Sequence, residues 1–178
     1  MDMYSSGLGG LIYLDSSSRP PHDVERFVLP DGYDIVIADT LTPRNTSDVI
    51  SDKRRRYEAK EPQIMKYVET TEDLIKEIRE LLKGSPIDIQ RLGLLVHKSH
   101  ILLRDHMGVS TNLLEEGVER SLKNGALGAK LTGTGMGGCL FALVPTDKTK
   151  GLVNSLSELP VKVYVTSPSE KGVTVDTL

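Results

Sequence analysis

The stretch of the sequence most suggestive of chemistry is glycine-rich, GALGAKLTGTGMGGCLFALV at residues 125–144. Glycine adopts positive φ without strain and lets other groups approach the backbone closely. A loop of this kind can point several backbone N–H groups at one anion, commonly a phosphate, and threonine hydroxyls add further donors. A tight connection needed only for packing explains the glycines equally well. Six glycines fall within fourteen residues: Gly125, Gly128, Gly133, Gly135, Gly137 and Gly138, with Thr132 and Thr134 as the hydroxyl donors.

Two familiar phosphate motifs do not describe this loop. No Gly-Lys-Ser/Thr follows it, which excludes the Walker pattern. No helix opens directly after its third glycine, which excludes the dinucleotide-binding pattern.

Asp2 is the second candidate for chemistry. Small residues and then a strand-like run follow it. A carboxylate in such a position can act as a general base toward a hydroxyl substrate. Taken alone, the position favours a helix start or a terminal carboxylate.

Two charged stretches complete the candidates. In KSHILLRDHMGVST at 98–111, a spacing of four places His100 and Arg104 on one helical face, where a buried histidine and a surface ion pair are the simplest interpretation. The four consecutive cations Lys53-Arg54-Arg55-Arg56 point in different directions around a helix, so we expect a solvated face. A phosphate or partner patch is the second interpretation.

Strands flank these candidates in the first third of the chain. Residues 9–15 and 33–39 are apolar and β-branched, bounded by Gly, Pro or Asp, and residues 24–29 form a third such run. The Asp31-Gly32 pair between the last two runs indicates an antiparallel hairpin.

Helices follow from about residue 47 to residue 122. Apolar residues recur at helical spacing between Met65 and Leu82, and KGSP at 83–86 ends this run. A second amphipathic stretch extends from Ile87 to about Asp105. A third helix begins at Ser110 or Thr111, with Ser110 as a capping residue, and buries Leu113, Leu114, Val118 and Leu122.

After residue 124 the pattern returns to strands, at 126–131, 139–144 and 161–166, with a helix at 147–158. Residues 167–178 are polar and end in a short strand or a tail. This order predicts an α+β fold, a mainly antiparallel sheet with helices packed on one face.

Composition narrows the classes of function. Lys and Arg number 22 and Asp and Glu 25, a net charge of −3, which argues against general nucleic-acid or anionic-membrane binding. Cys139 is the single cysteine, so no disulfide framework and no cysteine pair for a metal exist, and we expect no metal site and a cytoplasmic location. No apolar run approaches the length needed to cross a bilayer.

Taken together, these stretches resemble the C-terminal half of the GHMP small-molecule kinase superfamily, whose C-terminal domain is ferredoxin-like. GAKLTGTGMGGC is similar to its third motif, the glycine-rich loop near substrate and phosphates. MDMYSSGLGG resembles the galactokinase segment M-D-Q-F-x-S-x-L-G that carries the catalytic base, which implies that Asp2 is the base. YDIVIADT with RRRYE, and SHILLRDHMGVST, resemble two further galactokinase stretches in the same order.

Mevalonate kinase resembles the chain almost as well. DMYSSGLGG aligns without a gap on its D-N-x-x-S-T-x-G-G pattern, and GALGAKLTGTGMGGC is nearer to its version of the loop. Galactokinases have a sugar-contacting tyrosine where this chain has residues near Ile50, and a longer connection after the arginine-rich helix. The acceptor is therefore a sugar hydroxyl in our first interpretation and mevalonate or phosphomevalonate in the second.

The superfamily's nucleotide-binding motif, P-x-x-x-G-L-G/S-S-S-A, has no counterpart here, because SSGLGG at 5–10 has the reversed order. The resemblance thus implies that residues 1–178 form the C-terminal domain of an ATP- and Mg²⁺-dependent kinase whose ATP-binding half is either an N-terminal half outside these residues or a partner subunit. The site residues it implies are Asp2 as base and a substrate and phosphate loop of Thr132, Gly133, Thr134, Gly135, Met136, Gly137 and Gly138. We expect the chain to be inactive alone; a small-molecule binding module without catalysis is the alternative.

Overall fold

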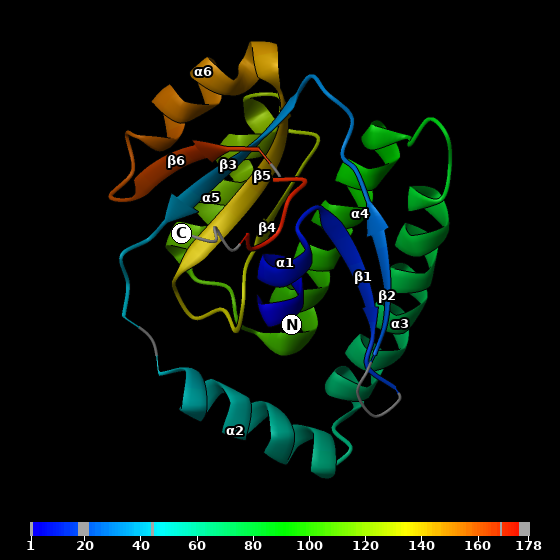
Figure 1. Ribbon diagram of the computed structural model, residues 1–178. Helices are drawn as coiled ribbons and strands as arrows, with labels where there is room; N and C mark the ends of the chain where they lie inside the picture. Colours follow the sequence, from blue (N-terminus) through cyan, green and yellow to red (C-terminus); the bar gives the residue numbers. More distant parts are fainter. Residues whose placement is uncertain (1, 18–21, 44, 168, 175–178) are drawn as a thin grey trace.

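The computed structural model describes residues 2–17, 22–43, 45–167 and 169–174. Within them, helices and strands follow the order expected for an α+β domain (Figure 1). The elements are α1 (Asp2–Leu8), β1 (Leu11–Asp15), β2 (Asp23–Phe27), β3 (Tyr33–Asp39), α2 (Thr46–Glu58), α3 (Pro62–Leu82), α4 (Ile89–Leu102), η1 (Leu103–Met107, a π-helical turn), α5 (Asn112–Lys123), β4 (Gly128–Leu131), β5 (Cys139–Pro145), α6 (Thr146–Leu156) and β6 (Lys162–Thr166).

The main sheet has four strands in the order β4-β5-β3-β6, and every neighbouring pair is antiparallel. Strand β3 lies inside the sheet, because β5 pairs with one of its edges and β6 with the other. Its Val36 and Ala38 are fully buried, which agrees with the apolar, β-branched composition of the run. Along the chain, helices connect β3 to β4 and β5 to β6, which is the ferredoxin-like arrangement.

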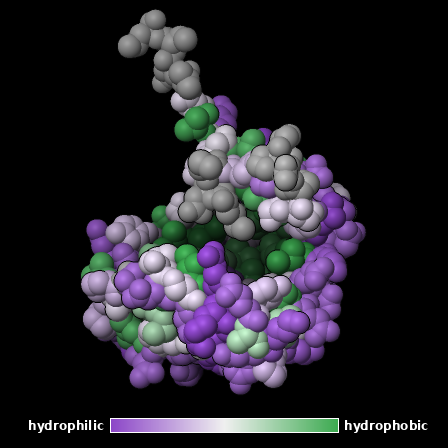
Figure 2. Space-filling view, turned by 90° about the horizontal axis from the view of Figure 1, so that it is seen from below, coloured by the Kyte–Doolittle hydropathy of each residue, from purple (hydrophilic) through white to green (hydrophobic). Residues whose placement is uncertain are grey.

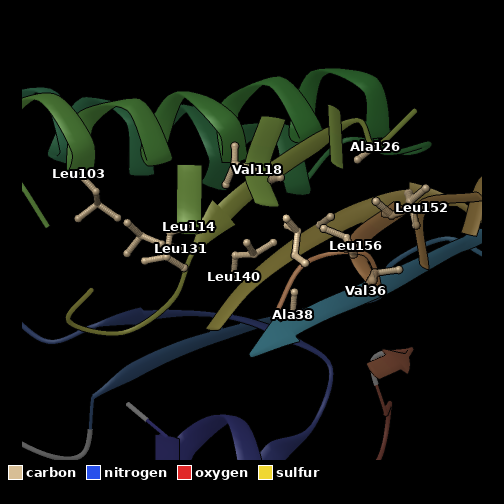
Figure 3. Packing of buried hydrophobic residues seen from close by; sticks show 14 of the residues in the cluster. Val36, Ala38, Leu103, Leu114, Val118, Ala126, Leu131, Leu140, Leu152 and Leu156 are labelled. Atoms are coloured by element: carbon tan, nitrogen blue, oxygen red, sulfur yellow. The ribbon is translucent and has the colours of Figure 1, made fainter. Parts of the chain in front are cut away.

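The hydrophobic core lies between the sheet and its helices (Figure 3). Leu114 of α5 and Leu152 of α6 are fully buried there, against Leu131 of β4 and Leu140 of β5. In Figure 3 the green helices lie above the sheet, and the blue helix α1 lies below it. The prediction of an α+β domain with an antiparallel sheet is therefore confirmed: α5 and α6 pack on one face, and the short α1 lies on the other.

The predicted hairpin at Asp31-Gly32 is wrong. Strand β2 pairs with β1, not with β3, in a separate two-stranded sheet. Strand β3 has no edge left for β2, because β5 and β6 occupy both. The turn at Gly32, with φ of 90°, leads the chain from one sheet into the other.

Side-chain contacts attach the β1–β2 hairpin to the rest of the domain, as an isolated two-stranded hairpin is only marginally stable. Arg79 of α3 forms an ion pair with Glu25 of β2, and its guanidinium carbon lies 4.6 Å from the centre of the Tyr13 ring. Leu11 and Phe27 pack against a hydrophobic cluster that includes residues of α3 and α4. The hairpin therefore lies over these two helices (Figure 1).

The segments predicted as helices are helical in the structure, but the burial and the capping of particular residues differ from the prediction. Helix α3 ends before Gly84 as predicted, although Met65, Val68 and Ile75 of its apolar stripe are exposed. The N-cap of α5 is Thr111, whose hydroxyl accepts a hydrogen bond from the Leu114 N–H at 3.3 Å. Ser110, the capping residue expected from sequence, does not perform this role, because Thr111 immediately precedes the first helical residue.

An apolar hollow of about 340 Å³ lies on the side of the sheet opposite the main core. It is lined by β1, by the outward-facing side chains of β3 and β5, and by α3 and α4, among them Ile12, Ile35, Ile78, Val96 and Phe141. Figure 2, which views the molecule from below, shows a hollow with hydrophobic residues at its floor and hydrophilic residues around its rim. Within the described part of the chain, no helix has the length and apolar character required to span a membrane.

Candidate functional site

The glycine-rich loop, residues 132–138, joins the adjacent strands β4 and β5 at one end of the sheet (Figure 1). Leu131 and Leu140 are opposite each other in the antiparallel register. Thr132 closes the hairpin: its N–H and its hydroxyl both donate to the Cys139 carbonyl, at 2.8 and 3.1 Å. The seven predicted loop residues therefore lie in one hairpin connection.

The loop backbone has the conformation for which its glycines were singled out. Positive φ angles occur at Gly133 (64°), Gly135 (78°), Met136 (61°), Gly137 (121°) and Gly138 (74°). An added Cβ at Gly135 would lie 2.4 Å from the Val109 carbonyl oxygen, so another backbone also approaches closely. Both needs, positive φ and close approach, are confirmed for this loop.

Three neighbouring segments hold the loop. The Met136 N–H donates to the Val109 carbonyl at 2.7 Å, and the Thr40 N–H donates to the Gly138 carbonyl at 2.9 Å. The Lys53 ammonium of α2 donates to the Thr134 carbonyl at 3.0 Å. The conformation of the loop is thus set by contacts with α2, with the end of β3 and with the turn after η1.

Two hydroxyls at this place have no protein partner in the described part of the chain. The Thr134 Oγ1 in the loop and the Ser110 Oγ, next to Val109, are both buried without a hydrogen bond. A buried hydroxyl without a partner costs free energy unless a ligand or water supplies a hydrogen bond. The Thr134 hydroxyl of the loop is therefore a donor that no described protein group uses.

The run of cations at 53–56 divides into two pairs. Arg54 and Arg55 are exposed, as expected for a solvated face. Lys53 and Arg56, which are one helical turn apart, turn toward the protein instead. The Arg56 guanidinium donates to the Met107 and His106 carbonyls at 3.1 and 3.2 Å and forms an ion pair with Glu61 at 2.8 Å. The expectation of a solvated face is therefore wrong for half of the run, and the i, i+3 spacing was the available signal.

A cleft of about 440 Å³ lies between α2, η1 and the loop. Lys53, Arg56 and Met136 border it, so the loop and the inward-facing cations share one depression. Acidic residues contribute as well: the lining includes Asp48, Asp52 and Asp105.

The His100 stretch is structural, as its simplest interpretation indicated. His100 is fully buried; its Nε2 lies 3.0 Å from a Glu115 carboxylate oxygen, and its Nδ1 accepts a hydrogen bond from the Leu131 N–H at 3.4 Å. Burial lowers the pKa of His100 below its usual value of 6.5, and the Glu115 charge opposes this only in part. Arg104 pairs with Asp105 and lies 3.5 Å from Glu115, so both members of the helical face meet the same carboxylate.

Asp2 is the first residue of α1, which agrees with the interpretation of a helix start. Helix α1 lies on the side of the sheet opposite the main core (Figure 3). The side chain of Asp2 is outside what the structure describes, so its assignment as base remains a prediction.

The described side chains do not fit a metal site. Among them, no three or more His, Cys, Asp or Glu groups come together in a way that would hold an ion.

Sequence reasoning missed Lys130 of β4. Ala129 and Leu131, its neighbours in the strand, are buried in the main core, so Lys130 points to the opposite face. Its ammonium donates to the Leu131 carbonyl at 3.2 Å, and burial and the nearby Lys53 charge lower its pKa. A lysine at an outward-facing position of an edge strand gives no sequence signal of burial.

Comparison with known proteins supports one family. The family model described as GHMP kinases C terminal matches residues 74–160. The mevalonate kinase of Thermococcus sibiricus is 30% identical over 179 residues, which cover 99% of this chain and 51% of that protein. The galactokinase of Thermococcus kodakarensis is 34% identical over 119 residues, which cover 67% of this chain and 31% of that protein.

Solved structures agree. The mevalonate kinase of L. major, in complex with R-mevalonate, is 27% identical and superposes with a TM-score of 0.80 over 94% of this chain and 52% of that one. The galactokinase of Lactococcus lactis, with galactose, gives a TM-score of 0.69 at 21% identity, over 86% of this chain and 49% of that one, and so supports the fold alone. The chain spans about half the length of the curated mevalonate kinases that it matches across nearly all of its own length.

Proposed function

The chain contains a GHMP kinase C-terminal domain, and from this premise we propose that it is the substrate-binding and catalytic half of an ATP-dependent kinase that phosphorylates a hydroxyl group of a small molecule. Residues 1–178 form this half as one domain. The proposal includes a cytoplasmic location, in line with the single cysteine, Cys139.

The observation that carries the proposal is the clamped glycine-rich loop. Its positive φ angles and its contacts with α2 and Val109 hold the backbone in one shape. Phosphoryl transfer depends mostly on positioning and on neutralising charge, so a fixed backbone loop suits it. In the proposed enzyme, residues 132–138 shape the acceptor site and stabilise the transferring phosphoryl group.

Asp2 is the proposed general base. It would accept or orient the proton of the acceptor hydroxyl as the oxygen attacks the phosphoryl group. The assignment rests on the resemblance of MDMYSSGLGG to the galactokinase segment that carries the catalytic base.

The identity of the phosphoryl acceptor is proposed from the relatives. Most of the curated relatives named by the sequence comparison are mevalonate kinases, and the galactokinase match is shorter. The preference for a sugar is not confirmed, and mevalonate or phosphomevalonate is the better first choice. A sugar remains the second candidate, because the galactokinase of Thermococcus kodakarensis is 34% identical over the matched residues.

The proposed partner is the ATP-binding half. The relatives are about twice as long as this chain, and ATP with its Mg²⁺ would be held mainly by the half that the chain does not match. The apolar hollow beside the β1–β2 hairpin is the proposed docking surface, since contiguous apolar hollows mark interaction sites. Without the partner, we expect the chain to be inactive.

The test is an ATP-coupled assay of the chain co-expressed with a polypeptide that carries the nucleotide-binding motif. Galactose, other hexoses, mevalonate and phosphomevalonate are the acceptors. Turnover with one acceptor identifies the substrate. A folded complex without turnover on any of them contradicts the kinase proposal and favours a catalytically inactive binding module.

In the same complex, Asp2→Asn tests the base. We expect turnover to fall by a factor of about 10² or more, because the transferred proton loses its acceptor. The acceptor KM changes little, since the amide has the same size. Turnover close to that of the unmodified complex would contradict the role of Asp2.

A further inference from the structure

We propose that Lys53 of α2 and Lys130 of β4 form an anion-binding site at the base of the glycine-rich loop, and that this site takes the anionic group, carboxylate or phosphate, of the acceptor. The second clause rests on the proposed kinase function; the first does not. The proposal therefore assigns an acidic acceptor to the chain and excludes a neutral sugar.

The first observation concerns how basic residues are satisfied in this molecule. Arg55, Arg79, Arg104 and Arg120 all have raised pKa values, and each contacts a carboxylate. The pKa values of Lys53 and Lys130 are instead lowered by burial. Among the described residues, neither lysine forms an ion pair, and each donates only to a backbone carbonyl.

The second observation is that the two lysines belong together. The charge of Lys53 contributes to the lowered pKa of Lys130, so the two ammonium groups are close enough to repel each other. They donate to carbonyls at either side of the loop's first turn, Lys130 to Leu131 and Lys53 to Thr134. Lys130 belongs to the edge strand β4 and Lys53 to helix α2, far away in the sequence. The hydrogen bond from Lys53 to Thr134 joins these two parts of the chain.

The third observation is the hydroxyl of Thr134, the residue whose carbonyl accepts from Lys53. The Thr134 Oγ1 is buried without a hydrogen-bond partner in the described part of the chain, in the same residue whose carbonyl accepts from Lys53. The ammonium groups of Lys53 and Lys130 are partly desolvated, and neither donates to a negatively charged acceptor; the Thr134 hydroxyl donates to no acceptor at all among the described residues. A carboxylate or phosphate oxygen would satisfy all three, and low local dielectric strengthens such contacts.

The nearest alternative counter-charges are used elsewhere. Asp52, adjacent to Lys53 in α2, lies 2.8 Å from Arg55 and 3.9 Å from Arg56. Glu61 lies 2.8 Å from Arg56. Asp52 of α2 and Glu61, which precedes α3, thus pair with arginines, and among the described residues neither lysine has a carboxylate partner.

The experiment is a binding titration of the 178-residue chain at constant ionic strength, in which isothermal titration calorimetry measures the binding. The ligands are mevalonate, inorganic phosphate, galactose and ATP without metal. We expect mevalonate and phosphate to bind and galactose not to bind. Lys130→Met and Lys53→Met should each weaken mevalonate binding by about tenfold, the size of one charge-assisted hydrogen bond.

Lys123→Met is the matched control. Lys123 is an exposed lysine that pairs with Glu119 at 2.6 Å. The substitution therefore removes one positive charge, as the test variants do, but at a position outside the loop. We expect unchanged binding. Lys130→Met should also raise the midpoint of thermal unfolding, because it removes a partly buried charge; Lys53→Met provides the second variant should Lys130→Met not fold.

Four results would overturn the proposal. They are galactose binding as tightly as mevalonate, no binding of any anion, equal weakening by Lys123→Met, or lysine-dependent binding of ATP alone, which would assign the site to the nucleotide. Failure of the kinase assay leaves the titration intact, so lysine-dependent binding of mevalonate and phosphate in a catalytically inactive chain would retain the anion site while rejecting the proposed function.

Discussion

Two neighbouring regions of the molecule differ in how their residues interact. One is the hydrophobic core beneath α5 and α6, to which β4 and β5 contribute, and the other is the glycine-rich loop that connects these two strands. In the core, Leu114, Leu140 and Leu152 are fully buried, and the buried His100 accepts a hydrogen bond at Nδ1, while its Nε2 lies 3.0 Å from the Glu115 carboxylate without a hydrogen bond. In the loop, the Thr134 hydroxyl is buried without a partner, and Met136 adopts a positive φ. The positive φ of Met136, a non-glycine residue, is a backbone cost of the kind that functional sites commonly retain.

The largest effect on stability is expected in the core. Leu140→Ala removes a fully buried side chain of β5 that packs beneath α5, where it lies against Gly117. We expect the free energy of unfolding to fall by about 3 kcal/mol, since the cavity cannot fully collapse. Urea denaturation measures this; a loss below about 1 kcal/mol would show that the core is not closely packed.

The next effect tests the loop. Gly135→Ala places a Cβ 2.4 Å from the Val109 carbonyl oxygen at a φ of 78°. We expect a loss of roughly 2 kcal/mol and a displaced loop. Mevalonate binding, measured in the same variant, should fall more steeply than for Leu140→Ala.

Gly151→Ala is the control for this substitution. Nothing lies within 4 Å of an added Cβ at this exposed helical position of α6. Alanine should stabilise the helix there by about 0.5–1 kcal/mol and leave binding unchanged. If both glycine variants behaved alike, the contrast between loop and scaffold would be wrong.

A smaller effect separates two adjacent hydroxyls. Thr111→Ala removes the N-cap of α5, which accepts from the Leu114 N–H, and should cost about 1 kcal/mol. Ser110→Ala removes a buried hydroxyl without a partner and should leave stability unchanged or slightly higher. Thermal unfolding of both variants provides the comparison; equal losses would place Ser110 in the scaffold.

The smallest effect concerns pH. Because burial lowers the pKa of His100 below 6.5, the unfolded chain binds this proton more readily than the folded one. Stability should therefore fall as the pH drops below about 6.5, and His100→Gln should reduce that slope. Glu25 and Asp105, whose pKa values are lowered by Arg79 and Arg104, act only in more acidic solution. A slope that is unchanged in His100→Gln would exclude His100 as its source.

Much of the fold was predictable because its determinants are local. Residues 33–39 were identified as a strand with the observed bounds, and the Gly84 stop after α3 was correct, since β-branched composition and chain breakers act over a few residues. The Asp31-Gly32 hairpin failed because local turn chemistry does not determine which strand pairs with which. The partners of β3 residues lie a hundred residues or more away in the sequence.

The sequence by itself determined where the candidate loop lies and that its glycines serve positive φ and close backbone approach, because glycine is the residue suited to that geometry. Only the tertiary structure decided what faces the loop. It turned Lys53 inward while Arg54 and Arg55 remained in solvent, and it brought Lys130 from β4 within the electrostatic reach of Lys53. The burial of a charge depends on the packing of distant segments, and no local pattern encodes that packing.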